Sequence, residues 1–428
     1  MANARKLALK ALLSVSQDGA YSNITLNNLL KENEVPKTDA SFIAALFYGV
    51  LDRTITLEYV LSQYIRTPLK KVPQISLCVL KLSLYQIMYM DKVPARAAVD
   101  EAVKLIKSSK ERYNSAFVNG VLRNILRNEI KLPQDNSAPS LSVRYSVPQN
   151  IVESFVDDFG EDNAIAILED SLKRPPIVLK VNTTKTSTDE LIGLLTAEGV
   201  SVEKSEFPNS VIVNGSINIA KSKCYKNGLF YVQDLASQMA VSALEPKANE
   251  RILDICSAPG GKSFAAAISM ENCGEIISCD IYENKIDLIK NGVERLGLDI
   301  INPKVSDALT YNKELGLFDK VICDVPCSGW GVIRRKPEIK YKHIESFEEL
   351  QSIQTGILNN AMKYLKLGGL LMYSTCTLRN SENGAIVRAY LDKNAGCELK
   401  YERTYMPHID GTDGFYCAII KKAGDINR

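Results

Sequence analysis

Apolar residues in the first part of the chain recur at the spacing of amphipathic helices. Leu7, Ala8, Ala11, Leu12 and Val15 set this pattern near the start. The same period returns in four further segments: Ala40–Leu51, Val79–Met90, Ala95–Lys107 and Ser115–Arg127. Prolines separate these segments, as they do at helix boundaries: Pro36, Pro68, Pro73 and Pro94. Residues 1–130 are therefore predicted to form an all-helical domain.

The stretch that follows changes character twice. Residues 131–147 are rich in Pro, Asn, Asp and Ser and have no apolar period, which predicts a linker. Residues 148–230 contain some segments with helical spacing and others with the character of strands. Helical spacing is found in Ile151–Phe159, Glu161–Leu172 and Thr188–Glu198, and strand character in Ile177–Val181 and Ser210–Val213. This region is predicted to be a small α/β subdomain.

Residues 231–428 alternate regularly between strands and helices. The predicted strands are short apolar runs rich in β-branched residues: Arg251–Cys256, Glu275–Asp280, Asp319–Cys323 and Leu370–Ser374. The predicted helices between them are Lys262–Met270, Asn284–Leu296 and Phe347–Leu365. Such alternation predicts an α/β domain with a parallel, doubly wound sheet.

Charge is distributed unevenly along the chain, although the net charge is only +2. Residues 1–130 contain 18 Lys and Arg against 11 Asp and Glu, a net charge of +7; the remainder contains 34 against 39, a net charge of −5. A basic first domain suggests contact with a polyanion, with Arg5, Lys6 and Lys10 as candidate residues. The alternative is an ordinary solvated surface.

Composition excludes several classes of protein. No apolar run approaches the roughly 20 residues of a membrane span, and no signal-peptide core is present, so we expect a cytoplasmic protein without membrane contact. The ten cysteines show no disulfide framework and no metal-ligand spacing, so no metal is expected. With only two histidines, chemistry that needs a histidine base is disfavoured. We expect a monomer.

One segment at the end of the first predicted strand has the features of a cofactor loop. After Asp254 it contains Cys256, Ser257, Ala258, Pro259, Gly260, Gly261 and Lys262. The glycines let a ligand approach the backbone closely, and the following helix presents free N–H groups. A phosphate-binding P-loop is excluded because it needs glycine where Cys256 stands, and the dinucleotide fingerprint is absent.

Acidic residues follow the next two strands at positions suited to a nucleoside. Asp280 closes the second predicted strand, where a carboxylate can bind ribose hydroxyls. Ser306 and Asp307 fall where a third strand would end, near an adenine. Each position alone could be a turn or an N-cap. Together, in order along one sheet, they predict a cofactor that contains a nucleoside.

Two later strands end in cysteines. Asp324 is followed by Val-Pro-Cys327, and Ser374 by Thr-Cys376. Ligands bind at the carboxyl ends of the strands in open α/β sheets, and neighbouring strands lie about 4.8 Å apart. If these strands are neighbours, both thiols face one crevice beside the cofactor, where a thiolate can act as a covalent nucleophile. The alternative is that both are buried core cysteines.

Over nearly its whole length the chain resembles the RNA cytosine-C5 methyltransferases, and within them the bacterial small-subunit ribosomal RNA enzymes of the RsmB (Sun/Fmu) type. The matching catalytic motifs are Gln233–Gln238, Cys256–Lys262, Asp280, Asn291–Gly297, Asp324–Cys327, Val332–Arg335, Thr375-Cys376 and Asp413–Phe415. The helical region resembles NusB, an RNA-binding antitermination factor, in Phe42–Val50, Pro94–Val103 and Phe117–Arg123.

The resemblance implies a class I, Rossmann-like methyltransferase domain at 231–428 that uses S-adenosylmethionine. Its substrate would be the C5 atom of a cytosine in small-subunit (16S) ribosomal RNA, naked or in an early assembly state. Cys376 would add to C6, and Cys327 would help to release the methylated base. The cofactor loop, Asp280, Asp307 and Asp324 would line the cofactor site, and a protonated Asp324 near N3 would stabilise developing charge. Trp330 departs from the usual small polar residue, which alters loop packing or base stacking.

Three alternatives stay open at this point. A sibling enzyme could methylate transfer RNA or large-subunit RNA, and only the helical domain argues against it. An amino-group methyltransferase would need an aromatic residue in the loop that instead contains Cys327. A non-catalytic RNA-binding factor would not need the cofactor and cysteine motifs, and binding of S-adenosylmethionine would distinguish it from the enzymes.

Overall fold

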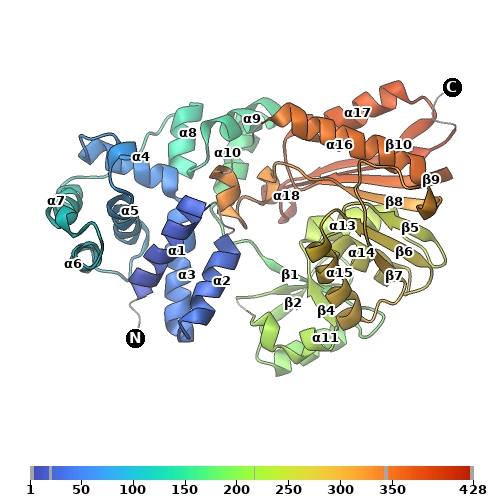
Figure 1. Cartoon of the computed structure of the whole chain (residues 1–428), viewed down its shortest axis with the longest axis horizontal. Helices are drawn as coiled ribbons and strands as arrows, with labels where there is room; N and C mark the ends of the chain where they lie inside the picture. Colours follow the sequence, from blue (N-terminus) through green and yellow to red (C-terminus); the bar gives the residue numbers. More distant parts are fainter. Residues whose placement is uncertain (1–3, 19–21, 216, 342–345, 425–428) are drawn as a thin grey trace. The chain divides into compact units, whose positions relative to one another are not determined.

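The structure, a computed structural model, describes residues 4–18, 22–215, 217–341 and 346–424. The chain forms two compact units, and each is described by itself (Figure 1). The first unit is Met1–Lys173 with Ile333–Lys342, and the second is Arg174–Val332 with His343–Arg428. The compact units therefore divide the chain at Lys173, beyond the boundary at residue 130 that the sequence pattern indicates.

Helices build the first unit (Figure 1). They are α1 Ala4–Asp18, α2 Ser22–Glu32, α3 Lys37–Asp52, α4 Thr54–Tyr64, α5 Gln74–Tyr89, α6 Ala95–Lys107, α7 Ser115–Leu126, α8 Ala138–Tyr145, α9 Gln149–Phe159 and α10 Glu161–Asp170. The helical prediction for residues 1–130 is confirmed, and α6 has the predicted bounds. The sequence pattern does not indicate α4, because its β-branched start has weak helix propensity. Burial of Leu57, Val60 and Leu61 stabilises α4 instead.

Two properties of the described residues bear on the class of protein. Within the described ranges no single helix is both long and apolar enough to cross a membrane, and one bent pair, Thr38–Asp52 with Thr54–Tyr64, meets that test only jointly. No group of three or more His, Cys, Asp or Glu in the same ranges is arranged to hold a metal ion.

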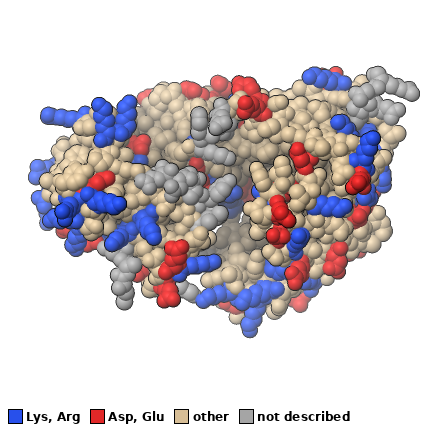
Figure 2. Space-filling view, in the orientation of Figure 1, with Lys and Arg blue, Asp and Glu red and all other residues tan. Residues whose placement is uncertain are grey.

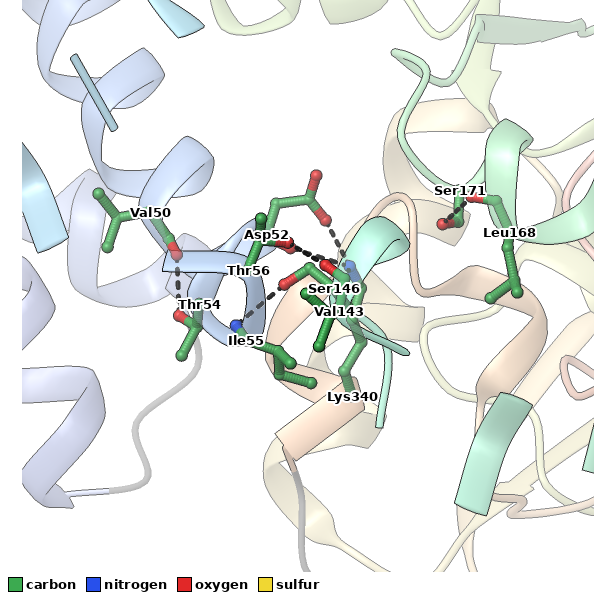
Figure 3. Close-up of polar contacts among 10 residues, drawn as sticks. All are labelled: Val50, Asp52, Thr54, Ile55, Thr56, Val143, Ser146, Leu168, Ser171 and Lys340. Atoms are coloured by element: carbon green, nitrogen blue, oxygen red, sulfur yellow. Dashed lines mark hydrogen bonds and ion pairs between the residues drawn. The ribbon is translucent and has the colours of Figure 1, made fainter. Parts of the chain in front are cut away.

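The segment predicted to be a linker contains helix α8. Its Leu141 is fully buried, so α8 packs into the first unit despite the polar sequence around it. Side chains fasten its end to α4: Ser146 Oγ accepts a hydrogen bond from the Ile55 N–H at 3.0 Å, and Thr56 Oγ1 donates to the Val143 carbonyl at 2.6 Å (Figure 3). Helices α9 and α10, expected within the α/β subdomain, also belong to this unit.

A short segment from much later in the chain completes the first unit. Ile333–Lys342 clusters with the helices, and its 3₁₀ helix spans Pro337–Tyr341. Arg334 forms an ion pair with Asp170 at 2.7 Å, and both side chains are nearly buried. Lys340 is fully buried, and its Nζ lies 2.6 Å from Asp52 Oδ1 and 3.4 Å from the Ser146 carbonyl (Figure 3). Two ion pairs therefore hold the segment in place.

We predict that replacing Lys340 with methionine lowers the free energy of unfolding of the first unit by about 2–4 kcal/mol. Losing one partner leaves a charge without compensation, and the cost stays below that of a fully buried pair because Asp52 is 23% exposed. Urea unfolding of the full chain, followed by far-ultraviolet circular dichroism, measures the change. Lys336→Met, at an exposed position of the same segment, is the control. Equal midpoints for the two variants would contradict the prediction.

A small antiparallel sheet opens the second unit. Its strands are β1 Ile177–Val181, β2 Val202–Lys204, β3 Ser210–Val213 and β4 Phe230–Val232, in the order β2-β3-β1-β4. Helices α11 Thr188–Ala197 and α12 Lys223–Lys226 accompany it. Leu179, Val181, Leu191 and Leu195 form the core between β1 and α11. The predicted strands β1 and β3 are confirmed, whereas the three-residue strands β2 and β4 are too short to show a period.

The larger sheet has seven strands in the order β10-β11-β9-β8-β5-β6-β7. They span β5 Arg251–Asp254, β6 Glu275–Asp280, β7 Ile301–Val305, β8 Phe318–Asp324, β9 Leu365–Thr375, β10 Cys397–Tyr405 and β11 Phe415–Lys422. From β7 to β9 all neighbours are parallel, but β11 is antiparallel to β9 and β10 antiparallel to β11. The sheet therefore has the predicted parallel, doubly wound part from β7 to β9, and the antiparallel strands β11 and β10 extend it at one edge.

Helices cover both faces of the large sheet, as a doubly wound fold requires (Figure 1). They are α13 Leu235–Leu244, α14 Gly261–Ser269 and α15 Glu283–Leu296 on one face and α16 Phe347–Ala361 and α17 Gly384–Lys393 on the other, with the short α18 Pro407–Asp410 between β10 and β11. Adjacent residues of one strand point into different layers: Ile252 packs with the first set and Leu253 with the second. The carboxyl ends of β5 to β9 consequently meet at one edge.

Candidate active site

All of the candidate site residues lie at the carboxyl ends of the parallel strands. The cofactor loop follows β5, Asp280 is the last residue of β6, and Asp307 comes just after β7. Asp324 ends β8, and Cys376 directly follows β9. Because β8 pairs with β5 on one side and β9 on the other, the cysteines and the loop occupy neighbouring positions along this edge.

Backbone and hydroxyl hydrogen bonds hold the cofactor loop against β6. The N–H and Oγ of Ser257 both donate to the Cys279 carbonyl, at 2.8 and 3.0 Å. Gly260 has a φ of +106°, and its N–H donates to the Ser257 carbonyl at 2.7 Å. Helix α14 starts at the next residue, so its free N–H groups lie directly behind the loop. The loop is thus preformed for a ligand at the helix N-terminus.

The buried carboxyl group of Asp254 connects the strand before this loop to the helix after it. Asp254 is fully buried, and its Oδ2 accepts a hydrogen bond from Ser263 Oγ at 2.7 Å. Ser263 also lies 2.6 Å from Ser278 Oγ on β6. Burial raises the pKa of Asp254 to about 7. The sequence places Asp254 at the start of the motif, and the structure shows that it joins β5, β6 and α14 inside the protein.

The acidic residues after β6 and β7 suit the hydroxyl groups and base of a nucleoside. Asp280 Oδ1 accepts one hydrogen bond from the Tyr282 N–H at 3.2 Å and lies 3.6 Å from Lys285 Nζ. Asp307 is exposed, and Leu309 N–H and Thr310 Oγ1 donate to it. Exposed apolar side chains adjoin both carboxylates: Ile281, Tyr282 and Leu309. Carboxylate acceptors beside apolar side chains fit a ribose with a flat base.

Lys262 and Asp324 form an ion pair between the cofactor loop and the end of β8. The segments that follow β8 and β9 contain Cys327 and Cys376 and are called the cysteine loops. Lys262 Nζ lies 2.6 Å from Asp324 Oδ2, and Ser374 Oγ donates to Asp324 Oδ1 at 2.7 Å. Burial disfavours the ammonium group, but the neighbouring carboxylate outweighs that effect and raises the pKa of Lys262. The sequence assigns Lys262 to the cofactor loop alone, whereas the structure brings its charge to the end of β8.

The two cysteine side chains are in contact. Cys327 Sγ lies 3.3 Å from Cys376 Sγ. The parallel pairing of β8 with β9 aligns Asp324 with Ser374, so the loops after these residues run side by side. The hydrogen bond with Cys376, together with burial, raises the pKa of the Cys327 thiol well above its usual range. Either thiol can be the donor in this contact, so the two cysteines can exchange a proton.

Close backbone packing fixes the distance between the two cysteine loops. Gly331 N–H donates to the Cys376 carbonyl at 3.0 Å, and Gly414 N–H donates to the Gly331 carbonyl at 2.9 Å. A β-carbon on Gly331 would lie 1.9 Å from the Gly414 carbonyl oxygen, so this position admits no side chain. Ser328 Oγ and Thr377 Oγ1 add a hydrogen bond of 2.7 Å between the loops.

Glu382 supports the loop that contains Cys327, and the sequence does not indicate it. It is fully buried, and its Oε2 accepts hydrogen bonds from Ser328 N–H and Gln354 Nε2, both at 2.9 Å. Gln354 Nε2 also donates to the Pro326 carbonyl at 2.9 Å. The carboxylate therefore holds the residues on both sides of Cys327. No local pattern marks a buried acid between β9 and α17.

Trp330 packs inside the protein. The sequence alone left two roles open for it, loop packing and base stacking. It is 4% exposed, and its ring meets that of Phe347 edge-on with centroids 5.4 Å apart. The Arg379 guanidinium stacks on Phe347 at 3.8 Å and lies 5.6 Å from the Trp330 ring. The structure favours loop packing, because a ring buried in this way has no face free for a base.

Three families match successive parts of the chain. Residues 2–127 match the NusB family, residues 147–220 match an RsmF/B-like, ferredoxin-like domain, and residues 241–421 match the 16S rRNA methyltransferase RsmB/F family. The crystal structure of PH0851 is similar over 97% of this chain and 99% of that one, with a TM-score of 0.83 and 25% sequence identity. The fold prediction is thus confirmed: a helical NusB domain, a small ferredoxin-like subdomain and a class I methyltransferase domain.

Relatives match over the full length. The probable ribosomal RNA small subunit methyltransferase B of Bacillus subtilis is 36% identical, over 98% of this chain and 99% of the relative. The ribosomal RNA small subunit methyltransferase B of Proteus mirabilis is 30% identical over the same shares. The chain therefore belongs to the RsmB-type family of 16S ribosomal RNA methyltransferases, with a NusB domain at its N-terminus.

Proposed function

We propose that this protein transfers a methyl group from S-adenosylmethionine to C5 of a cytosine in small-subunit ribosomal RNA. The observation that carries the proposal is the pair of thiols 3.3 Å apart, next to the Lys262–Asp324 ion pair. Membership of the methyltransferase family supports the choice of cofactor. The names of the full-length relatives support the RNA substrate.

The residues at the strand ends would hold the cofactor. The loop Cys256–Lys262 would contact it through the backbone, with Asp280 and Asp307 on the nucleoside and Asp324 towards the reacting end. Bound S-adenosylmethionine supplies a sulfonium methyl group as the electrophile. Carboxylates along one wall of the site suit both the ribose hydroxyls and the positive charge of the sulfonium group.

Cys376 is assigned the covalent step. Its thiolate adds to C6, which makes C5 nucleophilic; after methylation C5 loses its proton, that electron pair forms the C5–C6 double bond, and the thiolate leaves. The 3.3 Å contact with Cys327 supports this assignment, because a neighbouring thiol can exchange a proton with Cys376. Cys327 then assists release of the base. The Lys262–Asp324 pair is placed to stabilise charge on the ring.

Mapping of 5-methylcytosine tests the proposal. Small-subunit RNA from cells with and without the gene should differ at one cytosine, and the purified protein should restore it. The target base must leave its stack at a cost of a few kcal/mol, which favours a loop or bulge. Methylation found only on transfer RNA or large-subunit RNA would overturn the choice of substrate.

Asp280→Ala is predicted to weaken cofactor binding by about 1–3 kcal/mol, the cost of losing hydrogen bonds to a charged group. Calorimetric titration with S-adenosylmethionine measures the dissociation constant. Asp287→Ala, an exposed acid on α15, is the control for the loss of charge. Identical constants for the wild type and Asp280→Ala would exclude the ribose role.

The basic surface of the NusB domain is predicted to bind RNA phosphates through Lys6 and Lys10. Both are exposed on α1, whereas Arg5 is engaged with Gln86 and the Phe42 ring. The double variant Lys6→Gln/Lys10→Gln should reduce the slope of log affinity against log salt by about 0.7–0.9 for each lost phosphate contact. These substitutions are preferable to truncation near residue 148, which would cut through the first unit. An unchanged slope would exclude this surface.

A further inference from the structure

A cavity lies in the second unit, outside the cysteine site. It has a volume of about 140 Å³ and is enclosed by β1, the β2–β3 connection, α13 and α14. Val241, Ala265 and Gln238 form a buried floor, and Pro208 and Asn209 belong to the exposed rim. All of these residues belong to the second unit. The cavity therefore has a buried floor and an exposed rim, as a ligand pocket does.

Lys180 brings an ammonium group to this cavity. It lies on β1, opposite Ser210 of β3 and Tyr231 of β4, and it is 9% exposed. No residue that lines the cavity is acidic, and in the described ranges Lys180 Nζ has neither an ion pair nor a hydrogen bond. Burial lowers the pKa of Lys180 to about 8. The Lys180 side chain is nearly buried, but its Nζ is not among the fully buried polar atoms, so water can occupy its three donors until a ligand accepts from them.

The neighbours of Lys180 narrow the choice of ligand. The Phe207 ring centroid lies 5.6 Å from Nζ and provides an aromatic wall. Gln238 is already satisfied, since its Oε1 accepts from Ser210 Oγ at 2.6 Å and its Nε2 donates to the Gln233 carbonyl at 3.0 Å. Among the lining residues Lys180 is the one cation, and the buried floor combines the apolar Val241 and Ala265 with the amide of Gln238. Lys180 is the one charged donor beside the neutral side chains of Asn209, Ser242 and Ser269, so the lining would neutralise a phosphate only in part.

A flat ring matches the cavity better than a phosphate. Cavities of about 150 Å³ hold one benzene-sized molecule. Single-stranded RNA is recognised by bases that leave the stack, lie against aromatic side chains and accept hydrogen bonds at their edges. We propose that this cavity binds one unstacked base of the RNA substrate, with Phe207 against the ring and Lys180 donating to a carbonyl oxygen or ring nitrogen. This inference rests on the proposed RNA substrate.

Equilibrium binding to short single-stranded RNAs tests the proposal without requiring methyl transfer. The full-length protein is titrated with four homopolymers and with an abasic strand that has the same backbone. Lys180→Met should weaken binding of at least one base-containing strand by about tenfold, the scale of losing contacts with one base. On the abasic strand Lys180→Met should match Lys221→Met, which removes an exposed lysine of the same subdomain.

Phe207→Leu provides a second variant in case Lys180→Met does not fold, and it should affect the same strand. Equal losses on the abasic and base-containing strands would show that the cavity takes a phosphate, and no loss for either variant would show that it takes no RNA. Both results overturn the proposal. Mapping of 5-methylcytosine separately tests the reaction, so the two ideas can fail independently.

Discussion

Cys376→Ala should abolish methyl transfer, by at least about a thousandfold, and should form no covalent complex with RNA. Without the thiolate there is no bond to C6, so C5 keeps the low nucleophilicity of an aromatic carbon and only binding contributes. Transfer of a labelled methyl group to a small-subunit RNA transcript measures the rate. Cys273→Ala is the matched control, because this cysteine is exposed and precedes the amino end of β6, away from the carboxyl ends that hold the site. Activity in Cys376→Ala near that of the control would reject the covalent role.

Cys327→Ala should give the opposite pattern: a protein–RNA complex that survives denaturing gels in the presence of S-adenosylmethionine. Attack by Cys376 remains possible in this variant, but the second thiol 3.3 Å away is gone, so release of the product slows. The complex should disappear when Cys376 is also replaced. A complex trapped by Cys376→Ala and absent from Cys327→Ala would reverse the two roles. Activity retained in both variants, without any complex, would leave the cysteines as core residues.

Local pattern was sufficient for much of the fold and for the position of the site. Strand β6 and helix α6 have the predicted bounds. The continuous apolar run of β6 indicates a buried strand, and the clear 3.6-residue period of α6 indicates a helix. The strand-end motifs follow from the same logic, since a parallel sheet collects the residues that terminate its strands. The adjacency of β8 and β9, a condition in the sequence argument, holds in the structure.

The elements that escaped prediction depend on contacts distant in sequence. Strand β10 is half exposed and alternates only partly, and its place beside β11 is set by pairing rather than by its own residues. Glu382 matters because its buried carboxylate reaches Ser328 and Gln354, which lie in two other segments. Lys262 was assigned to one loop by its neighbours in sequence, but its long side chain ends on Asp324 of another strand. Tertiary placement decides each of these roles.

Because the chain is synthesised from its N-terminus, the segment Ile333–Lys342 reaches the first unit late. Asp52 and Asp170 leave the ribosome long before their partners Lys340 and Arg334, with the roughly 170 residues after Lys173 still to be made. At about 5–20 residues per second, Asp170 waits roughly 10–30 s for Arg334, and Asp52 waits roughly 15–60 s for Lys340. During that interval the nascent helices can form, but their last polar contacts cannot. The first unit is therefore completed only after Cys327 has been synthesised, so a prematurely terminated chain would lack the finished helical unit.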